Sequence, residues 1–412
     1  HLVPAVLLAL FLLSVLVYDI VFGPVVQVLD EAIPIDPNPR IAVNFDTVGK
    51  FGKNKDQIPL MNFGITTLPR NINDVASQLT FDTHGATNST VLHIGGADFT
   101  FGKPADGKWI TMAEKFGDHG GKKSVWLPQK GVSNIQVTQL VDIIPGDPVE
   151  LKSGKLKRYL DTCRIRWVLK NTGKTPTDVG LRFALDTLIG GNDGVPFTVP
   201  GKKGLVDKMA EFPTPKQIPD FVQVLEFPDL ANPGIVGFIN LKLGGATEAP
   251  NRMLLTEWPF QTNNLFSWDV PVRPFNGDSA VVLYWHVEKL KPGQEREVGF
   301  AYGLGNLSIA GGKLGVSVGG NFVVNGEMTI QALVNNPEKG QKLTLKLPDG
   351  LSLIDRGTEH KIVEMPQAGA VQQSPVDWRI RADRQGTFVI EVLSSTGISQ
   401  KKTITIKAKT IF

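Results

Sequence analysis

Apolar and polar positions alternate along most of the chain after residue 40, a pattern typical of half-buried β-strands. The alternating runs are bounded by Gly, Pro and Asn, which favour turns. A helical period appears only in the segment KGLVDKMAEF, residues 203–212, where we expect a short helix. The pattern therefore predicts a mainly β, antiparallel protein.

Two neighbouring runs show the alternation best. Over 163–169 the odd positions are apolar and the even ones include Arg164 and Arg166. Over 181–187 the apolar residues at 181, 183 and 185 share one face, while Arg182 and Asp186 lie on the other. If these strands pair across NTGKTPTD, the three arginines and Asp186 share one sheet face. That face is either solvated and lined by ordinary ion pairs, or a basic surface for an anionic glycan or partner.

The N-terminal segment, residues 1–24, is almost entirely apolar. About 20 apolar residues can cross a bilayer as a helix, so we expect a single transmembrane helix here. A cleaved signal peptide would need small residues before its cut site, and a buried helix would not be apolar all round. A fourth interpretation, copper chelation by His1 as a free N-terminal residue, is disfavoured because His1 leads directly into the apolar run.

The order of segments predicts four parts. The transmembrane helix over 1–24 is followed by a Pro-rich linker over 25–40, which contains three prolines and three acidic residues. A large antiparallel β-sandwich is expected over 41–308. Short strands over 309–412 predict an immunoglobulin-like β-sandwich, with Trp378 and Ile380 facing its interior.

Composition and charge narrow the functional classes. Hydrophobic residues make up 42% of the chain and charged residues 20%, which is enough for a packed core. The net charge is only +3 and no long basic block occurs, so no nucleic-acid partner is expected. Cys163 is the single cysteine. Its place in an apolar alternation predicts a buried small side chain and not a nucleophile.

Two stretches resemble known families. TIQALVNNPEKGQKLTLKLPDGLSLIDRG (329–357) and VDWRIRADRQGTFVIEVLSSTG (376–397) together resemble bacterial immunoglobulin-like envelope modules of the CARDB type. That resemblance implies adhesion, spacing or assembly without catalysis. The stretch from Arg164 to Gly201 is similar to the long paired strands of the galactose-mutarotase-like supersandwich. The histidine pair and glutamate of that family find no match here, so its activity is not implied.

The loop DTLIGGNDGVPF, residues 186–197, is the most site-like segment. Asp186, Asn192 and Asp193 offer oxygen ligands of the kind that calcium binds, although the spacing matches no EF-hand. Asn-Asp-Gly also suits a tight turn, because these residues tolerate positive φ. The sequence leaves both interpretations open and suggests no cofactor other than calcium.

An aromatic stretch over 254–276 is the second candidate site. Its rings, Trp258 and Trp268 among them, either cap the open end of a large core or form a platform on which sugars stack. In the second interpretation, Arg164, Arg166 and Arg182 would contribute to the same ligand surface.

The absence of a recognisable catalytic motif favours a non-enzymatic function. We expect a membrane-anchored protein whose body works on the extracytoplasmic side, periplasmic or at the cell surface, as a structural subunit or scaffold. Its partners would be membrane lipid, through the N-terminal helix, and other envelope or membrane-complex subunits. The alternatives are a carbohydrate-binding or carbohydrate-active supersandwich, for which glycan is the partner, and a calcium-dependent adhesin.

Overall fold

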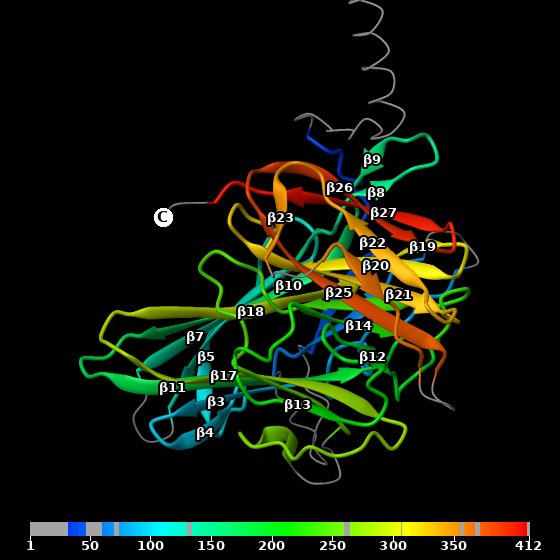
Figure 1. Cartoon of the computed structure of the whole chain (residues 1–412). Helices are drawn as coiled ribbons and strands as arrows, with labels where there is room; N and C mark the ends of the chain where they lie inside the picture. Colours follow the sequence, from blue (N-terminus) through cyan, green and yellow to red (C-terminus); the bar gives the residue numbers. More distant parts are fainter. Residues whose placement is uncertain are drawn as a thin grey trace, which may run out of the picture.

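The protein is described by a computed structural model that covers residues 32–46, 60–69, 74–129, 134–258, 264–305, 307–354, 358–366 and 371–409. Almost every regular element in these ranges is a β-strand, and the strand ladders are antiparallel (Figure 1). The mainly β, antiparallel architecture is therefore confirmed.

The larger part of the molecule is built on two sheets. The eight-stranded sheet has the order β12 (Phe197–Thr198), β14 (Phe221–Leu225), β15 (Val236–Asn240), β18 (Glu295–Leu304), β10 (Leu160–Asn171), β7 (Ile135–Pro145), β6 (Lys122–Pro128), β5 (Gly107–Lys115). The six-stranded sheet has the order β13 (Ala210–Phe212), β16 (Arg252–Thr256), β17 (Ser279–Leu290), β11 (Thr177–Thr187), β3 (Ser89–Ile94), β4 (Ala97–Thr100).

The main core lies between these two sheets. Strand β10 contributes its odd-numbered apolar residues, and Cys163 is among them with 0% exposure, as predicted. Strand β11 faces it from the other sheet with Leu181, Phe183 and Leu185. The rings of Trp167 and Phe183 meet across the core with their centroids 5.2 Å apart. Burial raises the pKa of the Cys163 thiol, which suits a packing role.

The pairing predicted across residues 171–178 is wrong. Strand β10 pairs with β7 and β18, whereas β11 pairs with β3 and β17 in the other sheet. The reason is that both strands carry apolar side chains on one face, and these faces pack against each other instead of lying side by side. The connection therefore crosses from sheet to sheet, and the buried Asn171 amide fastens it by donating to Thr175 O and Leu290 O.

The other face of the six-stranded sheet carries a smaller core. It contains Ala184 from β11, Leu254 from β16, Val282 and Tyr284 from β17, and Val270 from the segment that covers them. Residues 264–276, which begin with the 3₁₀ helix η2 (Asn264–Phe266), thus lie over this face. The alternation of β11 explains both cores, because its odd residues enter the main core and its even residues face this covering segment.

The C-terminal strands form a second, smaller sandwich with its own core. Its five-stranded sheet has the order β19 (Ser308–Ala310), β20 (Leu314–Gly320), β21 (Glu327–Asn335), β25 (Gln373–Ala382), β23 (Leu351–Leu353). Its four-stranded sheet has the order β24 (His360–Ile362), β22 (Lys342–Lys346), β26 (Gly386–Ser394), β27 (Ser399–Ile406). Trp378 and Ile380 both lie in the core between them, as the alternation predicts.

Short strands complete the fold. β1 (Ile41–Phe45) pairs with β2 (Phe63–Thr67) and adds apolar side chains to the main core, while β8 (Val149–Glu150) pairs with β9 (Leu156–Lys157). The short helix expected over 203–212 is absent: this segment is irregular and ends in strand β13. Phe212 is buried there at the sheet edge, so tertiary packing overrides the local helical period.

The expected N-terminal transmembrane helix over 1–24 lies outside the described residues. Within the ranges given above, no helix is long and apolar enough to cross a membrane, and the single helical element is the three-residue η2. The fold class is accordingly corrected to mainly β, with no membrane-crossing helix in the part of the chain that the structure describes. The membrane-anchored, extracytoplasmic localisation that we derived from that helix loses its support with it.

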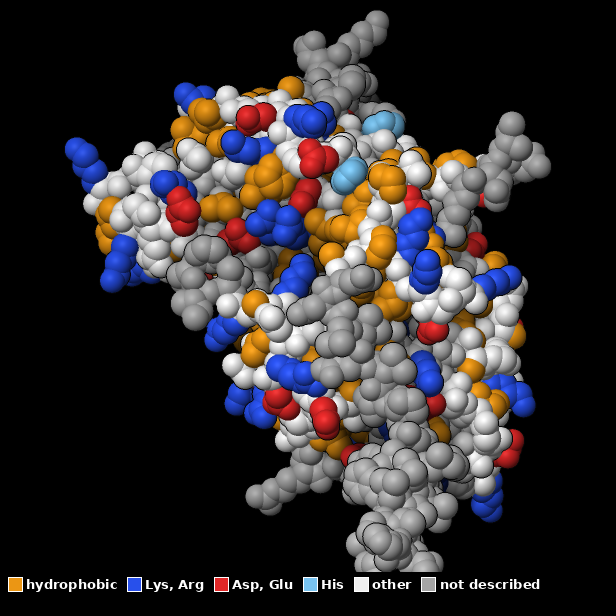
Figure 2. Space-filling model, turned by 90° about the horizontal axis from the view of Figure 1, so that it is seen from above, with side chains coloured by type: hydrophobic (Ala, Val, Ile, Leu, Met, Phe, Trp, Pro, Cys, Tyr) orange, Lys and Arg blue, Asp and Glu red, His pale blue; other side chains and the backbone are white. Residues whose placement is uncertain are grey.

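Basic and acidic side chains are interspersed over the face of the molecule drawn in Figure 2, with hydrophobic side chains between them. This mixture agrees with the small net charge of +3. Specific sites therefore have to be found from local geometry and not from an overall field.

Candidate metal centre

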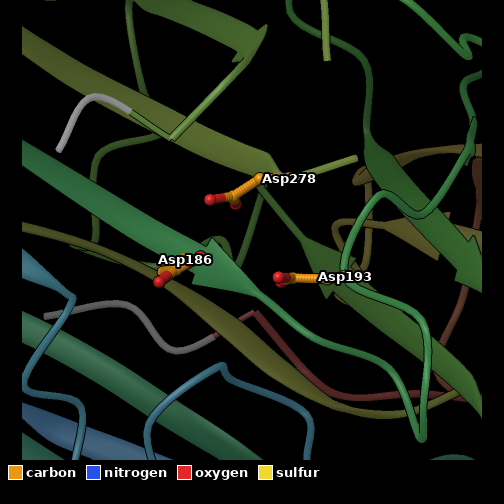
Figure 3. A group of neighbouring side chains, drawn as sticks. All are labelled: Asp186, Asp193 and Asp278. Carbon is orange, nitrogen blue, oxygen red and sulfur yellow. The ribbon is translucent and has the colours of Figure 1, made fainter. Parts of the chain in front are cut away.

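Three aspartate side chains lie close together where strand β11 leaves the six-stranded sheet (Figure 3). We call Asp186, Asp193 and Asp278 the aspartate triad. Asp186 is the penultimate residue of β11, Asp193 lies in the loop that follows, and Asp278 directly precedes β17. The antiparallel register of β11 and β17 pairs Asp186 with Ala280. This long-range pairing brings the end of one strand beside the start of the other.

Hydrogen bonds fix the backbone around the triad. The Ser279 amide and hydroxyl both donate to Asp193 O at 3.0 Å. The Thr187 hydroxyl donates to Ser279 O at 2.6 Å, and the Asp186 amide donates to Asn88 Oδ1 at 2.8 Å. The three carboxylates therefore project from a backbone that is held in place from two sides.

One carboxylate oxygen of each triad member lacks the hydrogen-bond partner that buried polar atoms normally have. One oxygen from each aspartate lies within 4.8 Å of those of the other two. Asp186 is only 1% exposed, and Asp193 and Asp278 are half-buried. Among the described residues, Oδ1 of each of the three accepts no hydrogen bond. A buried carboxylate without a partner is costly, so the geometry calls for a group that neutralises it.

Burial shifts all three acids toward their protonated forms. It raises the pKa of Asp186 to about 8, with the neighbouring acids Asp278, Asp193 and Asp82 adding to the effect and the Thr87 hydroxyl opposing it. Burial, with Asp193 and Glu257 nearby, raises the pKa of Asp278 to about 7. Burial also raises the pKa of Asp193. A cation between the carboxylates would relieve the same repulsion that favours their protonated forms.

The donor set suits a hard divalent cation. Ca²⁺ binds six to eight oxygen atoms and accepts carboxylates in one- or two-oxygen contact. Zn²⁺ favours nitrogen and sulfur, and the triad has neither. Three aspartates can supply half or more of a calcium shell, and the half-buried side of the site is open to further oxygen ligands.

The sequence singled out two members of the triad and missed the third. Asp186 and Asp193 do come together, but the Asn192 side-chain amide donates to Glu226 O at 3.0 Å. Asp278 was missed because it lies 85 positions after Asp193 in the chain. Its local signal is the FNGDSA turn, a second Asx-Gly turn immediately before a strand.

Arg182 lies on the same face of β11 but has a different role. It is 0% exposed, and its guanidinium donates to Ser89 Oγ at 2.6 Å, to Leu265 O at 2.8 Å and to Ser267 O. Burial lowers the pKa of Arg182 to about 10, so it stays charged at neutral pH. The arginine therefore anchors the covering segment 264–276 to the sheet and offers no surface to a ligand.

Arg164 and Arg166 lie in the eight-stranded sheet, apart from Arg182. Arg164 donates to both carboxylate oxygens of Asp142, at 3.1 and 2.8 Å, and Arg166 lies 3.4 Å from Glu297. The basic face expected from pairing β10 with β11 is therefore not formed, because the two strands belong to different sheets. Cross-strand ion pairs account for both of these arginines.

The two tryptophans named as sugar-binding candidates are half-buried. Trp268 packs edge-to-face against Tyr284 and at a tilt against His93, with ring centroids 5.5 and 5.4 Å away, and its backbone amide donates to Asp98 Oδ2 at 3.0 Å. Trp258 donates from Nε1 to Thr87 O at 3.0 Å. Trp258 therefore lies beside the aspartate triad through Thr87, whereas Trp268 packs over the smaller core.

Comparison with known proteins gives no family assignment. No protein-family model matches the chain, and no curated protein matches its sequence, so the CARDB resemblance has no support.

Three similar solved structures bear carbohydrate-related names. A polysaccharide lyase aligns over 90% of this chain and 46% of its own, at 10% identity and a TM-score of 0.34. An Escherichia coli K12 protein described as a candidate aldose 1-epimerase aligns over 64% of this chain and 83% of its own length, at 8% identity and a TM-score of 0.29.

The third structure, from the human microbiome, is described as a candidate kojibiose phosphorylase. It aligns over 64% of this chain and 25% of its own, at 8% identity and a TM-score of 0.24. This chain thus spans less than half the length of the lyase and a quarter of the phosphorylase. The aspartate triad itself, and not these similarities, supports the function given below.

Proposed function

We propose that this chain is a calcium-binding β-sandwich protein. The ion would be held by Asp186, Asp193 and Asp278 and would tie the end of β11 and its following loop to the start of β17. The supporting observation is the Asp186 carboxylate, which is 1% exposed, has an Oδ1 without a partner among the described residues, and lies beside two further carboxylates. Native proteins leave few buried polar atoms in that state.

The same geometry favours binding over catalysis. A catalytic acid or base has to come within hydrogen-bond distance of its substrate, and the most perturbed member of the triad is almost fully buried. A bound cation needs no such access, because it can complete its shell on the half-buried side where Asp193 and Asp278 lie. Contact with other envelope or membrane-complex subunits stays a prediction.

Calorimetric titration of the chelator-treated full chain with CaCl₂ and with MgCl₂ tests the proposal. We expect saturable calcium binding and a higher melting temperature, since a ligand at a hundred times its Kd stabilises the folded state by about 2.7 kcal/mol. Asp186→Asn and Asp278→Asn should abolish both effects. Asp349→Asn, at an exposed position of the C-terminal sandwich, is the matched control and should leave them unchanged. Absence of calcium heat and of any melting shift in the unmodified chain would overturn the proposal.

Carbohydrate binding at the same site is a second candidate function, favoured by the position of Trp258. Its half-buried ring is fixed by the bond to Thr87 O, next to Asp186. A calcium ion held by carboxylates on one side can accept sugar hydroxyls on the other, while an adjacent ring stacks on the sugar face.

A glycan array probed in calcium and again in chelator tests this second function. Binding that requires calcium and is lost in Trp258→Ala would support it. Calcium binding without any glycan signal would support the calcium site and contradict the carbohydrate-binding function.

A further inference from the structure

A second concave surface lies between the two sandwiches. It is a groove of about 780 Å³ and shares no lining residue with the aspartate triad. The larger sandwich supplies residues 200–202, 211–212, 215–220 and 242, and the C-terminal sandwich supplies Thr329, Lys361, Asp377 and Arg379. Its volume falls within the range of about 300 to 1,000 Å³ that small-molecule sites occupy.

Two hydrogen bonds fasten the walls of the groove together. The Thr329 hydroxyl donates to Asp220 Oδ2 at 2.6 Å, and the Gly201 amide donates to Asp377 Oδ2 at 2.6 Å. Each bond joins the larger sandwich to the C-terminal one. The groove is therefore a fixed feature of the interface between the sandwiches.

The acidic side chains of the groove are already used within the protein. Asp220 pairs with Lys242 at 2.7 Å in addition to its bond from Thr329. Glu211 pairs with Arg252 at 2.8 Å. With Asp377 bound to the Gly201 amide, each of the three lining carboxylates has a protein donor.

Three of the lining lysines form no ion pair among the described residues, and two of them keep their full charge available. Arg379 forms an ion pair with Glu327 at 2.6 Å, and Lys242 forms one with Asp220. Lys202, Lys216 and Lys361 have no carboxylate within ion-pair distance in the described part of the chain. Lys202 lies over the Phe212 ring, a contact that leaves its positive charge uncompensated, whereas Lys361 donates to Asp377 O and its charge is partly offset by the nearby Asp377 carboxylate.

We propose that this groove binds a small polyanionic saccharide, one that carries several sulfate or carboxylate groups. The three lysines come from three separate segments, the loop after β12, the loop before β14 and strand β24, so they can contact acid groups spaced along one ligand. An acidic peptide fits less well, because Phe212 and Ile218 are only 4% and 3% exposed and offer little surface to apolar side chains beside its acidic ones. The lysines suit sulfate or carboxylate as mobile point charges.

Calorimetry of the full chain with sucrose octasulfate and with trigalacturonate tests this inference, with sodium sulfate as the simple-anion arm. We expect one or both saccharides to bind more tightly than sulfate, and the binding to weaken between 50 and 300 mM NaCl. Lys202→Gln, Lys216→Gln and Lys361→Gln should each weaken it on the order of tenfold, the loss of one charge-assisted contact. Each variant's melting temperature reports that it is folded, and Lys216 lies on an exposed loop where glutamine is tolerated.

Two matched controls sharpen the result. Lys203 is the sequence neighbour of Lys202, is 82% exposed at its side chain and pairs with Glu364. Lys174 is an exposed lysine that does not line the groove. Lys203→Gln and Lys174→Gln should change affinity less than about twofold, because the Lys203 charge is paired with Glu364 and Lys174 lies outside the groove. The inference is overturned if neither saccharide binds, if the controls lose as much affinity as the groove variants, or if a glutamate octapeptide binds more tightly than both saccharides. The groove proposal does not depend on calcium, so a negative result would not contradict calcium binding by the aspartate triad.

Discussion

Arg182 and Asp186 lie four residues apart on the same face of strand β11, and both are almost completely buried. Arg182 is surrounded by acceptors from Ser89, Leu265 and Ser267. Asp186 is surrounded by further acids, and its Oδ1 has no partner among the described residues. The two side chains therefore share a position in the fold and differ in the polarity of the groups around them.

This difference separates a structural charge from a binding site. A buried charge whose neighbours carry the opposite polarity contributes to packing and specificity, whereas a buried carboxylate among further acids indicates a ligand that the chain does not supply. Burial alone would have placed Arg182 and Asp186 in one class. The hydrogen-bond partners assign the first to the covering segment 264–276 and the second to the candidate metal centre.

Replacement of Arg182 should have the largest effect. Arg182→Met removes the donors to Leu265 O, Ser267 O and Ser89, so we expect a loss of about 3 to 5 kcal/mol from several unpaired buried acceptors. Chemical denaturation measures it. Arg164→Met, which breaks only a partly exposed pair with Asp142, should lose about 1 kcal/mol or less. Equal losses in the two variants would show that Arg182 does not anchor the covering segment.

Replacement of Asp186 should act in the opposite direction. In chelator, Asp186→Asn removes the buried member of three repelling acids, and we expect it to stabilise the fold by about 1 to 2 kcal/mol at pH 8. With calcium present the unmodified chain should become the more stable of the two. Melting curves in chelator and in calcium give both comparisons. If Asp186→Asn instead destabilised the chelated protein as strongly as Arg182→Met, Asp186 would be a structural group like Arg182.

The alternation of polar and apolar residues predicted much of this arrangement. It placed Leu181, Phe183 and Leu185 on one face of β11 and Arg182 and Asp186 on the other, and both faces are confirmed. It could not predict which strand lies beside which, because pairing depends on contacts between residues far apart in the chain. The strand order joined β11 to β17, and that pairing brought Asp278 to Asp186. The local sequence over 186–193 identified two of the three aspartates and held no information on Asp278.

The same limit explains the failed prediction of a basic face. Strands β10 and β11 are consecutive and alternate alike, which is typical of a hairpin. Their apolar faces are wide enough, with Trp167 and Phe183 in contact, to form the two sides of a core instead. The pattern defines an inner and an outer face for each strand, and both a hairpin and a sandwich satisfy it. Only the packing of the whole sheet chooses between them.

The pH dependence of calcium binding should be of intermediate size. The pKa values of Asp186 and Asp278 are raised to about 8 and about 7 from an ordinary value of 3.8, so the chelated folded state keeps protons that the unfolded chain releases near pH 4. Without calcium, stability should therefore fall as the pH rises from about 4 to 8. Calcium must displace these protons, so its affinity should rise from pH 6 to 8, by about tenfold per pH unit for each proton released. Titrations in buffers of different ionisation enthalpy count those protons, and a pH-independent affinity would contradict the assigned shifts.

The smallest effect is expected at Asn192, which the local pattern placed in the calcium site beside Asp193. Its amide instead donates to Glu226 O, and the Glu226 carboxylate accepts from the Gly191 amide at 3.0 Å, so this side chain holds the loop against its neighbour. Asn192→Ala should lower stability by about 1 kcal/mol, one hydrogen bond, and change calcium affinity less than about twofold. Asp193→Ala, one residue along the same loop, should lose calcium binding. A large loss of calcium affinity in Asn192→Ala would mean that the amide turns toward the ion, and that the site is better described by the loop sequence than by the aspartate triad.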